Sequence, residues 1–512
     1  MRLTKLAVLW VLAGLAAPAL ADVPVAPPLS AQTQVEATLA AAPKGTRFGL
    51  LVVDEAGKAI VSINPDQRFI PASNTKLFTT AAAYALLPGI DKPDVAGGTQ
   101  VALVSDAQIK SFELDPTTIP GIGPSDPLPA EPVDVYLSGR GDARMSSALD
   151  CKTDCLATLA DAVAAKTLRV RDVVGDDSLW PDQRWSPGMS WNNIGTDDGT
   201  AASALNLDDN QVVVTITPGP ENHPAIVAVS PYFTVQNDTF TVFAGGKPGL
   251  RIERSVNGLN LRVFGAIPVD SAPWTHLIGI DDPAHFAAWN FRRMLEQRKV
   301  QVAGTVRVNH SGSEAYQRLY PLDERTPFDV GLVPLATISA PPLAEDMVTI
   351  NKVSQNLHAQ VLFRRLAPAP PNETQDRSFE AEQRLFEQAG IPREGFDFSD
   401  GSGMSTYNRV SPRAAVALLR WITTQPWGKA WYASLPIAGV DGTLKRRFIG
   451  TPLAGNLIAK TGTLNATNAL SGTFRTASGR TLTFAFFAND VPDGQSAVPA
   501  MEAVLLLIAA RN

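Results

Sequence analysis

A serine and a lysine three residues apart, Ser73 and Lys76, are the residues of this sequence best suited to covalent chemistry. They begin an Ala- and Leu-rich run without glycine or proline before Pro88, which predicts a helix over 73–87. Residues i and i+3 share a helix face, so the Lys76 amine can reach the Ser73 hydroxyl. A lysine of lowered pKa can activate a serine as its base. The alternative is a capping serine followed by a solvated lysine.

Two later motifs carry the same residue types in the order that this chemistry needs. They are Ser354-Gln355-Asn356 and Lys460-Thr461-Gly462-Thr463. Each motif has a purely structural alternative, because Ser354 and Asn356 could cap a helix over 356–366 and the second motif could end a strand. The three motifs together, in this order, favour a catalytic site over coincidence.

The first residues have the pattern of a secretory signal. Met1 to Lys5 carry positive charge, Leu6 to Leu20 are apolar, and an A-x-A site ends at Ala21. We therefore expect cleavage after Ala21 and a periplasmic protein. The apolar run is short for a membrane span, and no later stretch is long enough, so no transmembrane segment is expected in the mature chain.

Composition excludes several classes of partner. The net charge is −6 and the pI is near 5.5, with no basic cluster beyond Lys445-Arg446-Arg447, which argues against nucleic acid. The two cysteines, Cys151 and Cys155, favour a short-loop disulfide in an oxidising compartment, with free thiols as the alternative. The histidines show no ligand spacing with these cysteines, so neither a metal nor a cofactor is expected.

The strand patterns predict an α+β fold whose antiparallel sheet is assembled from both ends of the chain. Strands are expected at 47–53 and 59–63, before Ser73, and at 458–463, 469–475 and 481–489, followed by a C-terminal helix over 499–510. Helices should flank this sheet. The 512 residues are too many for one core. We expect a catalytic domain formed by 22–91 and 307–512.

Residues 92–306 have frequent proline and glycine and short β-type runs, which predicts a β-rich insertion of one or two subdomains. Its clearest feature is a hairpin of 250–256 and 259–265 around Asn257-Gly258. The other elements expected are strands at 100–104, 133–137, 211–217, 225–229 and 240–243, and helices at 147–166 and 283–298.

The trio S-x-x-K, S-x-N and K-T-G is typical of class A β-lactamases and penicillin-binding proteins. Longer stretches of sequence outside these three motifs point to one family among these enzymes. With these blocks the sequence resembles the class C low-molecular-mass penicillin-binding proteins, the D-alanyl-D-alanine carboxypeptidase/endopeptidase family of the penicillin-binding protein 4 type. The blocks are Asp400 to Ser405, Ser434 to Leu444, Leu470 to Gly472, Asp176 to Ser178, Trp191-Asn192 and Ser203 to Leu205.

The resemblance implies a serine DD-peptidase that acts on the stem peptides of peptidoglycan and is acylated by β-lactam antibiotics. Ser73 would attack the carbonyl of the penultimate D-Ala, with Lys76 as its base. Ser354 would pass a proton to the leaving amine, and Asn356 would bind the substrate amide. Removal of the terminal D-Ala is expected, with cleavage of D-Ala–diaminopimelate cross-links as a second activity.

The last motif would complete the substrate site. Lys460 would supply positive charge for the substrate carboxylate, and Thr461, Gly462 and Thr463 would line the same strand. The backbone N–H groups of Ser73 and Thr463 would form the oxyanion hole.

Two positions depart from the family pattern. Asn193 stands where the family usually has an Asp that recognises the free amino group of diaminopimelate, and Asp197 or Asp198 could replace it. Gln355 replaces the usual Asp of the second motif. A β-lactamase is the first alternative function, although no E-x-x-L-N-like segment lies between Ser354 and Lys460. A non-catalytic peptidoglycan-binding scaffold is the second, and the oligomeric state stays open.

Overall fold

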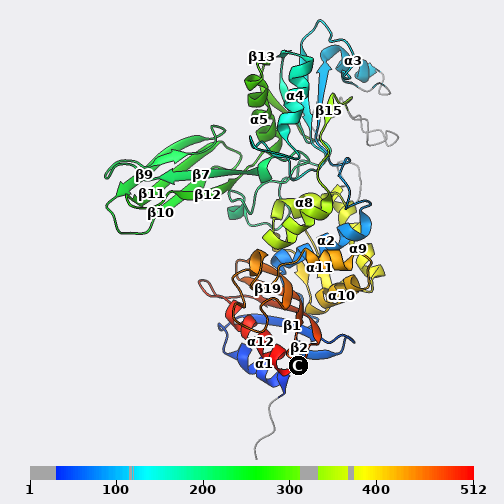
Figure 1. Ribbon diagram of the computed structural model, residues 1–512, viewed down its shortest axis with the longest axis vertical. Helices are drawn as coiled ribbons and strands as arrows, with labels where there is room; N and C mark the ends of the chain where they lie inside the picture. The colour runs from blue at the N-terminus through cyan, green and yellow to red at the C-terminus, as the bar shows by residue number, and fades with distance from the viewer. Residues whose placement is uncertain (1–29, 115–117, 119, 312–331, 367–373) are drawn as a thin grey trace, which may run out of the picture.

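The computed structural model describes residues 30–114, 118, 120–311, 332–366 and 374–512. The expected signal over residues 1–21 lies outside them. The molecule is elongated: one sheet lies near the C-terminus, a group of helices follows, and the inserted segment forms the far end with a β-module that projects to one side (Figure 1).

The sheet of the catalytic domain joins the two ends of the chain. Its order is β18-β19-β20-β1-β2, and all neighbours are antiparallel. The central strands β20 and β1 are buried on both faces because helices cover the sheet on both sides. The strands are β1 (Arg47–Val53), β2 (Ala59–Ile63), β18 (Leu457–Leu464), β19 (Thr467–Arg475) and β20 (Thr481–Asn489).

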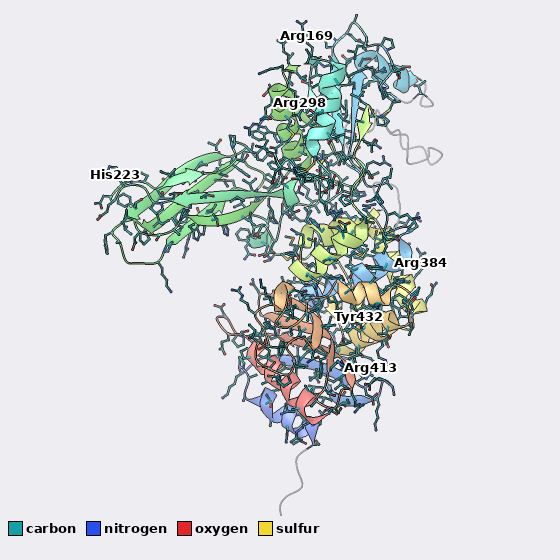
Figure 2. All side chains as sticks on the ribbon, in the orientation of Figure 1. Arg169, His223, Arg298, Arg384, Arg413 and Tyr432 are labelled. Carbon is teal, nitrogen blue, oxygen red and sulfur yellow. A yellow bond between two sulfur atoms is a disulfide. The ribbon has the colours of Figure 1, made fainter. Side chains whose placement is uncertain are left out.

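Helices α1 (Ala31–Ala40) and α12 (Val498–Arg511) cover one face of this sheet. A larger group covers the other face, and Phe78, Phe386 and Phe487 are buried in the core between that group and the sheet. Tyr432 is labelled in this group in Figure 2. Its elements are α2 (Thr75–Leu86), α7 (Leu343–Val348), α8 (Asn356–Arg364), α9 (Thr374–Gln388), α10 (Pro412–Thr423), α11 (Gly428–Ala433) and the strand pair β16 (Phe396–Asp397) and β17 (Arg409–Val410). The expected antiparallel sheet flanked by helices is confirmed.

The insertion contains a second five-stranded sheet, of mixed direction, in the order β14-β6-β4-β3-β15. Helices α4 and α5 pack together beside it. The elements are β3 (Gln100–Ser105), α3 (Asp106–Leu114), β4 (Val133–Ser138), α4 (Leu156–Lys166), β5 (Arg169–Val170), β6 (Val173–Asp176), α5 (Pro283–Gln297), β13 (Gln301–Val302), β14 (Val306–Asn309) and β15 (Ala336–Thr337).

The projecting module consists of two three-stranded sheets, β12-β7-β8 and β10-β11-β9. The hairpin around Asn257-Gly258 is present as β10 and β11. Its turn is closed by the Gly258 N–H, which donates to the carbonyl of Ser255 (3.2 Å), and Asn257 has a positive φ of 54°. The strand expected at 240–243 is the end of the longer β9. His223 marks the tip of the module in Figure 2. The strands are β7 (Gln211–Thr217), β8 (Ile226–Ala228), β9 (Thr234–Val242), β10 (Gly249–Arg254), β11 (Asn260–Pro268) and β12 (Trp274–Gly279).

The boundary expected between residues 306 and 307 cuts through the insertion's sheet. Strands β14 and β15 extend beyond that boundary, yet they pair with β6 and β3. Asp94 N–H also donates to the carbonyl of Ala340 (2.8 Å), which brings the two ends of the insertion together. We therefore propose that the insertion runs from about Asp94 to Ala340.

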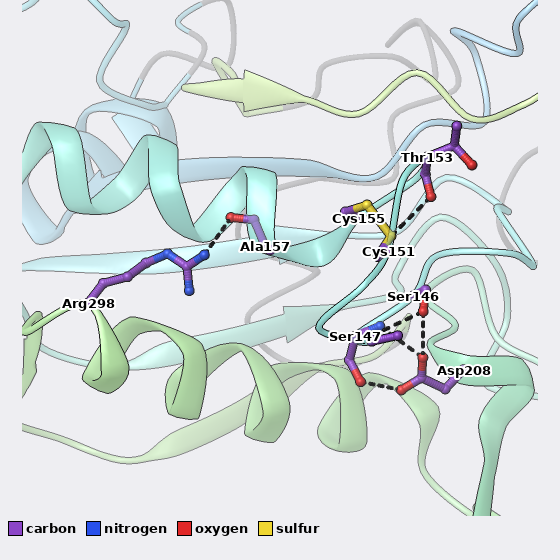
Figure 3. The surroundings of a disulfide bond; sticks show 9 residues. Ser146, Ser147, Cys151, Thr153, Cys155, Ala157, Asp208 and Arg298 are labelled. Carbon is purple, nitrogen blue, oxygen red and sulfur yellow. Dashed lines mark hydrogen bonds between the residues drawn. A yellow bond between two sulfur atoms is a disulfide. The ribbon is translucent and has the colours of Figure 1, made fainter.

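The helix expected over 147–166 begins only at Leu156. Asp208 accepts hydrogen bonds from the Ser147 N–H (2.8 Å) and the Ser147 hydroxyl (2.5 Å), and these bonds hold the chain out of a helix (Figure 3). The disulfide between Cys151 and Cys155 closes the loop just before α4. These long-range contacts override the local helical pattern.

Candidate active site

Ser73 lies in a short 3-10 helix, η1 (Ala72–Asn74), that leads into α2. The helix expected to start at Ser73 therefore starts two residues later. Lys76 still shares the face of Ser73, and its Nζ lies 3.0 Å from Ser73 Oγ. The spacing thus places an amine within proton-transfer distance of the hydroxyl.

Lys76 is fully buried, and its Nζ has three oxygen neighbours. Besides Ser73 Oγ, these are Asn356 Oδ1 at 2.6 Å and the carbonyl of Ser402 at 2.5 Å. Burial lowers the pKa of Lys76 to about 7, while the charges of Asp400 and Asp198 act against this shift. Near neutral pH a substantial fraction of Lys76 is therefore an unprotonated amine.

Ser354 and Lys460 form a second serine–lysine pair. Ser354 follows the π-helix η4 (Thr349–Val353) with a φ of 71°, a left-handed conformation that is uncommon for serine. Lys460 Nζ donates to Ser354 Oγ (2.8 Å) and to the carbonyl of Thr461 (3.1 Å). Burial, with Lys76 nearby, holds the pKa of Lys460 well below its ordinary value.

Asn356 joins the first pair to the insertion. It is the first residue of α8, and its Nδ2 donates to the carbonyl (3.0 Å) and the carboxylate (3.3 Å) of Asp198. Gln355, the unusual residue of this motif, caps α8 by accepting from the Leu357 N–H (3.0 Å). The middle position of the motif therefore shapes the helix start and leaves Ser354 and Asn356 in place.

Strand β18 passes directly beside the turn that carries Ser73. A Cβ added at Gly462 would lie 2.7 Å from the carbonyl of Pro71 and 3.1 Å from the backbone N of Ser73, so only glycine allows this approach. Asn74 Nδ2 fixes the strand by donating to the carbonyl of Lys460 (3.0 Å). Thr463, expected in the oxyanion hole, is exposed on this edge strand.

Two further residues of the edge strand and the loop before it are in contact. Thr461 Oγ1 donates to Thr443 Oγ1 (2.7 Å). Thr443 belongs to the 3-10 helix η6 (Gly442–Leu444), and both hydroxyl groups lie at the surface. Thr443 belongs to the block Ser434 to Leu444, but nothing in the sequence of that block indicates this contact.

The buried loop around Asp400 supplies one of the oxygen neighbours of Lys76. Asp400 accepts from the N–H groups of Gly403 and Ser405 (2.8 Å each) and from Asn408 Nδ2 (2.6 Å). These bonds hold the loop so that the Ser402 carbonyl faces Lys76. The sequence offered one signal for this loop, the block Asp400 to Ser405, but nothing in that block indicates a contact with Lys76.

The insertion contributes Asp198 to the site, while Asn193 lies in the 3-10 helix η2 (Trp191–Asn193) of the same loop. Partial burial, with Asp197 alongside, raises the pKa of Asp198 above its ordinary value, and Lys76 opposes this shift. Asp198 thus supplies a carboxylate on the insertion side of the site.

Two histidines, His358 and His310, lie close to aspartates, and both groups are explained by contacts within the protein. Burial alone would lower the pKa of His358, but contact with Asp346 and Asp209 raises it to about 10. His358 therefore ties α8 to the insertion as a charged group. Among the described residues, one group has metal-like spacing: Asp177, Asp182 and His310. The Arg184 guanidinium already pairs with Asp182 in that group (2.8 Å), which leaves little reason for a metal ion.

Comparison with known proteins gives one answer. The model of the D-Ala-D-Ala carboxypeptidase 3 (S13) family matches residues 31–110 and 129–511. The chain is 31% identical over 474 residues to a D-alanyl-D-alanine carboxypeptidase of an Actinomadura species, covering 89% of this chain and 80% of that relative. It is 24% identical over 471 residues to D-alanyl-D-alanine carboxypeptidase DacB of Haemophilus influenzae, covering 88% and 87%.

A solved structure shares the fold. Penicillin binding protein 4 (dacB) of Haemophilus influenzae superposes with a TM-score of 0.72 at 21% identity, over 93% of this chain and 98% of that one. No helix in the described ranges combines the length and apolarity that a membrane crossing requires. The chain belongs to the D-Ala-D-Ala carboxypeptidase 3 (S13) family of serine DD-peptidases, and it has the fold of penicillin binding protein 4.

Proposed function

We propose that Ser73 is the nucleophile of this DD-peptidase and that Lys76 is its base. The observation that carries the proposal is the position of the buried Lys76 amine, 3.0 Å from Ser73 Oγ, together with a pKa near 7. The neutral amine takes the hydroxyl proton as Ser73 attacks the carbonyl of the penultimate D-Ala. Asn356 and the Ser402 carbonyl hold the amine in place during this transfer.

The N–H groups of Ser73 and Thr463 would bind the oxyanion, a contribution of about 3–4 kcal/mol per donor in other enzymes. Ser354 then relays to the amine of the departing D-Ala the proton that Lys76 took from Ser73, and the acyl group stays on Ser73 until water hydrolyses the ester. Lys460, hydrogen-bonded to Ser354, would accept the substrate carboxylate as its counterion. An arriving carboxylate raises the pKa of a buried amine, so substrate binding itself would charge Lys460.

The same site is suited to cross-link cleavage when the leaving amine belongs to diaminopimelate. In that case Asp198 would take over the recognition of a free ammonium group, because an amide at Asn193 cannot form an ion pair. We also propose that the protein is exported to the periplasm after cleavage at Ala21. Peptidoglycan stem peptides are the proposed substrate and β-lactams the acylating inhibitors.

Mass spectrometry of the intact protein after brief exposure to benzylpenicillin tests the assignment. We expect one persistent adduct, mapped to Ser73, and none on a Ser73→Ala variant. An unmodified protein with unchanged drug would contradict catalysis. Rapid hydrolysis of the drug without an adduct would indicate a β-lactamase.

A further inference from the structure

A cavity lies within the insertion, and its lining includes none of the four residues of the serine–lysine pairs. Its volume is about 600 Å³, and its aromatic wall is formed by Trp185, Tyr232 and Phe233. Trp185 is half-buried, while Tyr232 and Phe233 are buried and packed edge to face. Cavities of this size and partly aromatic lining are typical of small-molecule sites.

Arg254 gives this cavity an unused set of hydrogen-bond donors. Only 3% of its side chain is exposed, and its Nη2 pairs with Asp281 (2.5 Å) and donates to the carbonyl of Ile194 (2.9 Å). Within the described part of the chain, Nε and Nη1 of Arg254 have no acceptor. Buried donors without an acceptor are costly, so a rotation of the guanidinium that offers one of them to a ligand oxygen at this wall would be favoured.

The other charged groups of the wall already have partners. Asp281 also accepts from the Asn257 N–H (2.5 Å). Asp282 accepts from the His285 N–H (2.9 Å) and from Arg184 (3.3 Å). The carboxylates are therefore satisfied, and they outnumber the guanidinium groups, which disfavours phosphate and other anions. An uncharged ligand with acceptor oxygens fits best.

A chain of contacts connects the cavity wall with the surroundings of Lys76. Trp185 Nε1 donates to the carbonyl of Gly199 (2.9 Å), and the preceding residue, Asp198, accepts from Asn356. Asn356 in turn contacts Lys76. This chain of contacts therefore links the cavity wall to the surroundings of Ser73. An extended stem peptide of four to five residues has a reach of roughly 13–18 Å.

We propose that this cavity binds an N-acetylated amino sugar of the glycan strand while the attached stem peptide lies at Ser73. The pyranose ring would stack on Trp185, and the acetamido oxygen would accept from Arg254. This inference rests on peptidoglycan as the proposed substrate. Within peptidoglycan the lactyl carboxyl of the sugar is consumed in an amide bond, so the ligand is uncharged, as the cavity requires.

Calorimetric titration with N,N′-diacetylchitobiose, a neutral amino-sugar disaccharide, tests the proposal. We expect saturable binding to the wild-type protein, unchanged after acylation by benzylpenicillin, and at least 10-fold weaker binding of cellobiose, which lacks acetamido groups. Absence of saturable binding, or equal binding of cellobiose, would overturn the proposal. The acylation step reports on the Ser73 assignment separately.

Substitutions in the cavity wall test whether chitobiose binds in this cavity. Arg254→Lys keeps a cation for Asp281 but removes the two unused donors, so chitobiose should bind at least 10-fold more weakly. Arg251→Lys, on the exposed face of the same strand, is the matched control and should bind normally. Normal binding by Arg254→Lys would refute the role of this cavity.

A second variant guards against an indirect effect of Arg254 on the loop around Ile194. Leu259 lines the cavity and is 41% exposed, so Leu259→Trp should fill the entrance without disturbing the core. We expect weaker chitobiose binding with an unchanged rate of benzylpenicillin acylation. If Arg254→Lys also slows acylation, the Leu259→Trp titration decides: unchanged binding there would contradict the proposal.

Discussion

The two serine–lysine pairs of the active site use the same residue types in different surroundings. Lys76 and Lys460 are both fully buried, and each amine lies about 3 Å from a serine hydroxyl. Burial lowers the pKa of Lys76 to about 7, and the negative charges of Asp400 and Asp198 limit this shift. Lys460 has Lys76 as its main charged neighbour, and burial together with that charge holds its pKa well below the ordinary lysine value.

This difference separates their roles. Nearby carboxylates keep Lys76 able to accept and return a proton at neutral pH, as a base must. Among the described residues no carboxylate acts on the pKa of Lys460, so in the proposed mechanism the substrate would supply the missing anion. Under the proposed mechanism, the different neighbours of the two lysines would make one a base and the other an anion receptor.

Removal of the Lys76 amine should have the largest effect. We expect Lys76→Met to slow acylation of Ser73 by benzylpenicillin by about 10³-fold or more, because the serine loses its base. Stopped-flow acylation followed by mass spectrometry measures the rate. Lys58→Met, at an exposed position, is the control and should react normally. Acylation of Lys76→Met at the wild-type rate would assign the base elsewhere.

Removal of the Lys460 amine should act mainly on the anionic end of the substrate. For Lys460→Met we expect kcat/KM to fall by about 10²-fold on a peptide ending in D-Ala-D-Ala. The same peptide with a C-terminal amide should lose much less, since it brings no carboxylate to the site. Equal losses on both peptides would mean that Lys460 acts through Ser354 alone.

The pH dependence of acylation should separate the two lysines further. The rate should rise with pH through a midpoint near 7, because the pKa of Lys76 is about 7 and the unprotonated amine is the active form. Asp198 raises the pKa of Lys76, so Asp198→Asn should move this midpoint to lower pH. Asp197→Asn is the matched control, since Asp197 is not among the charges that act on Lys76. A midpoint that stays in place in Asp198→Asn would contradict the coupling.

Local sequence patterns predicted the contact between Ser73 and Lys76, but not the residues that surround this pair. The i, i+3 spacing of Ser73 and Lys76 was enough to expect their contact, and the contact exists although Ser73 lies in a 3-10 turn. Strands β1, β2 and β20 also followed from their apolar runs. These features depend on neighbours within a few residues, which a sequence pattern records.

The supporting groups depend on contacts across the chain. Asp198 meets Asn356 across 158 residues, and Ser402 meets Lys76 across 326. No periodicity encodes such pairs, so only the choice between Asp197 and Asp198 could be raised in advance. The same limit explains the shortened α4, because Asp208 captures Ser147 from 61 residues away.

The smallest effect on catalysis should come from the disulfide, which lies in the insertion and contacts neither pair. Replacing Cys151 and Cys155 by serine should lower the free energy of unfolding by about 2 kcal/mol, the chain-entropy value for so short a loop. Thermal unfolding measures the loss, and the wild-type protein under reducing conditions should show a similar one. Acylation by benzylpenicillin should stay unchanged, because Ser73, Lys76 and their partners belong to other segments. A slower acylation would mean that the loop before α4 helps to hold Asp208 and, through the adjacent Asp209 and His358, the start of α8.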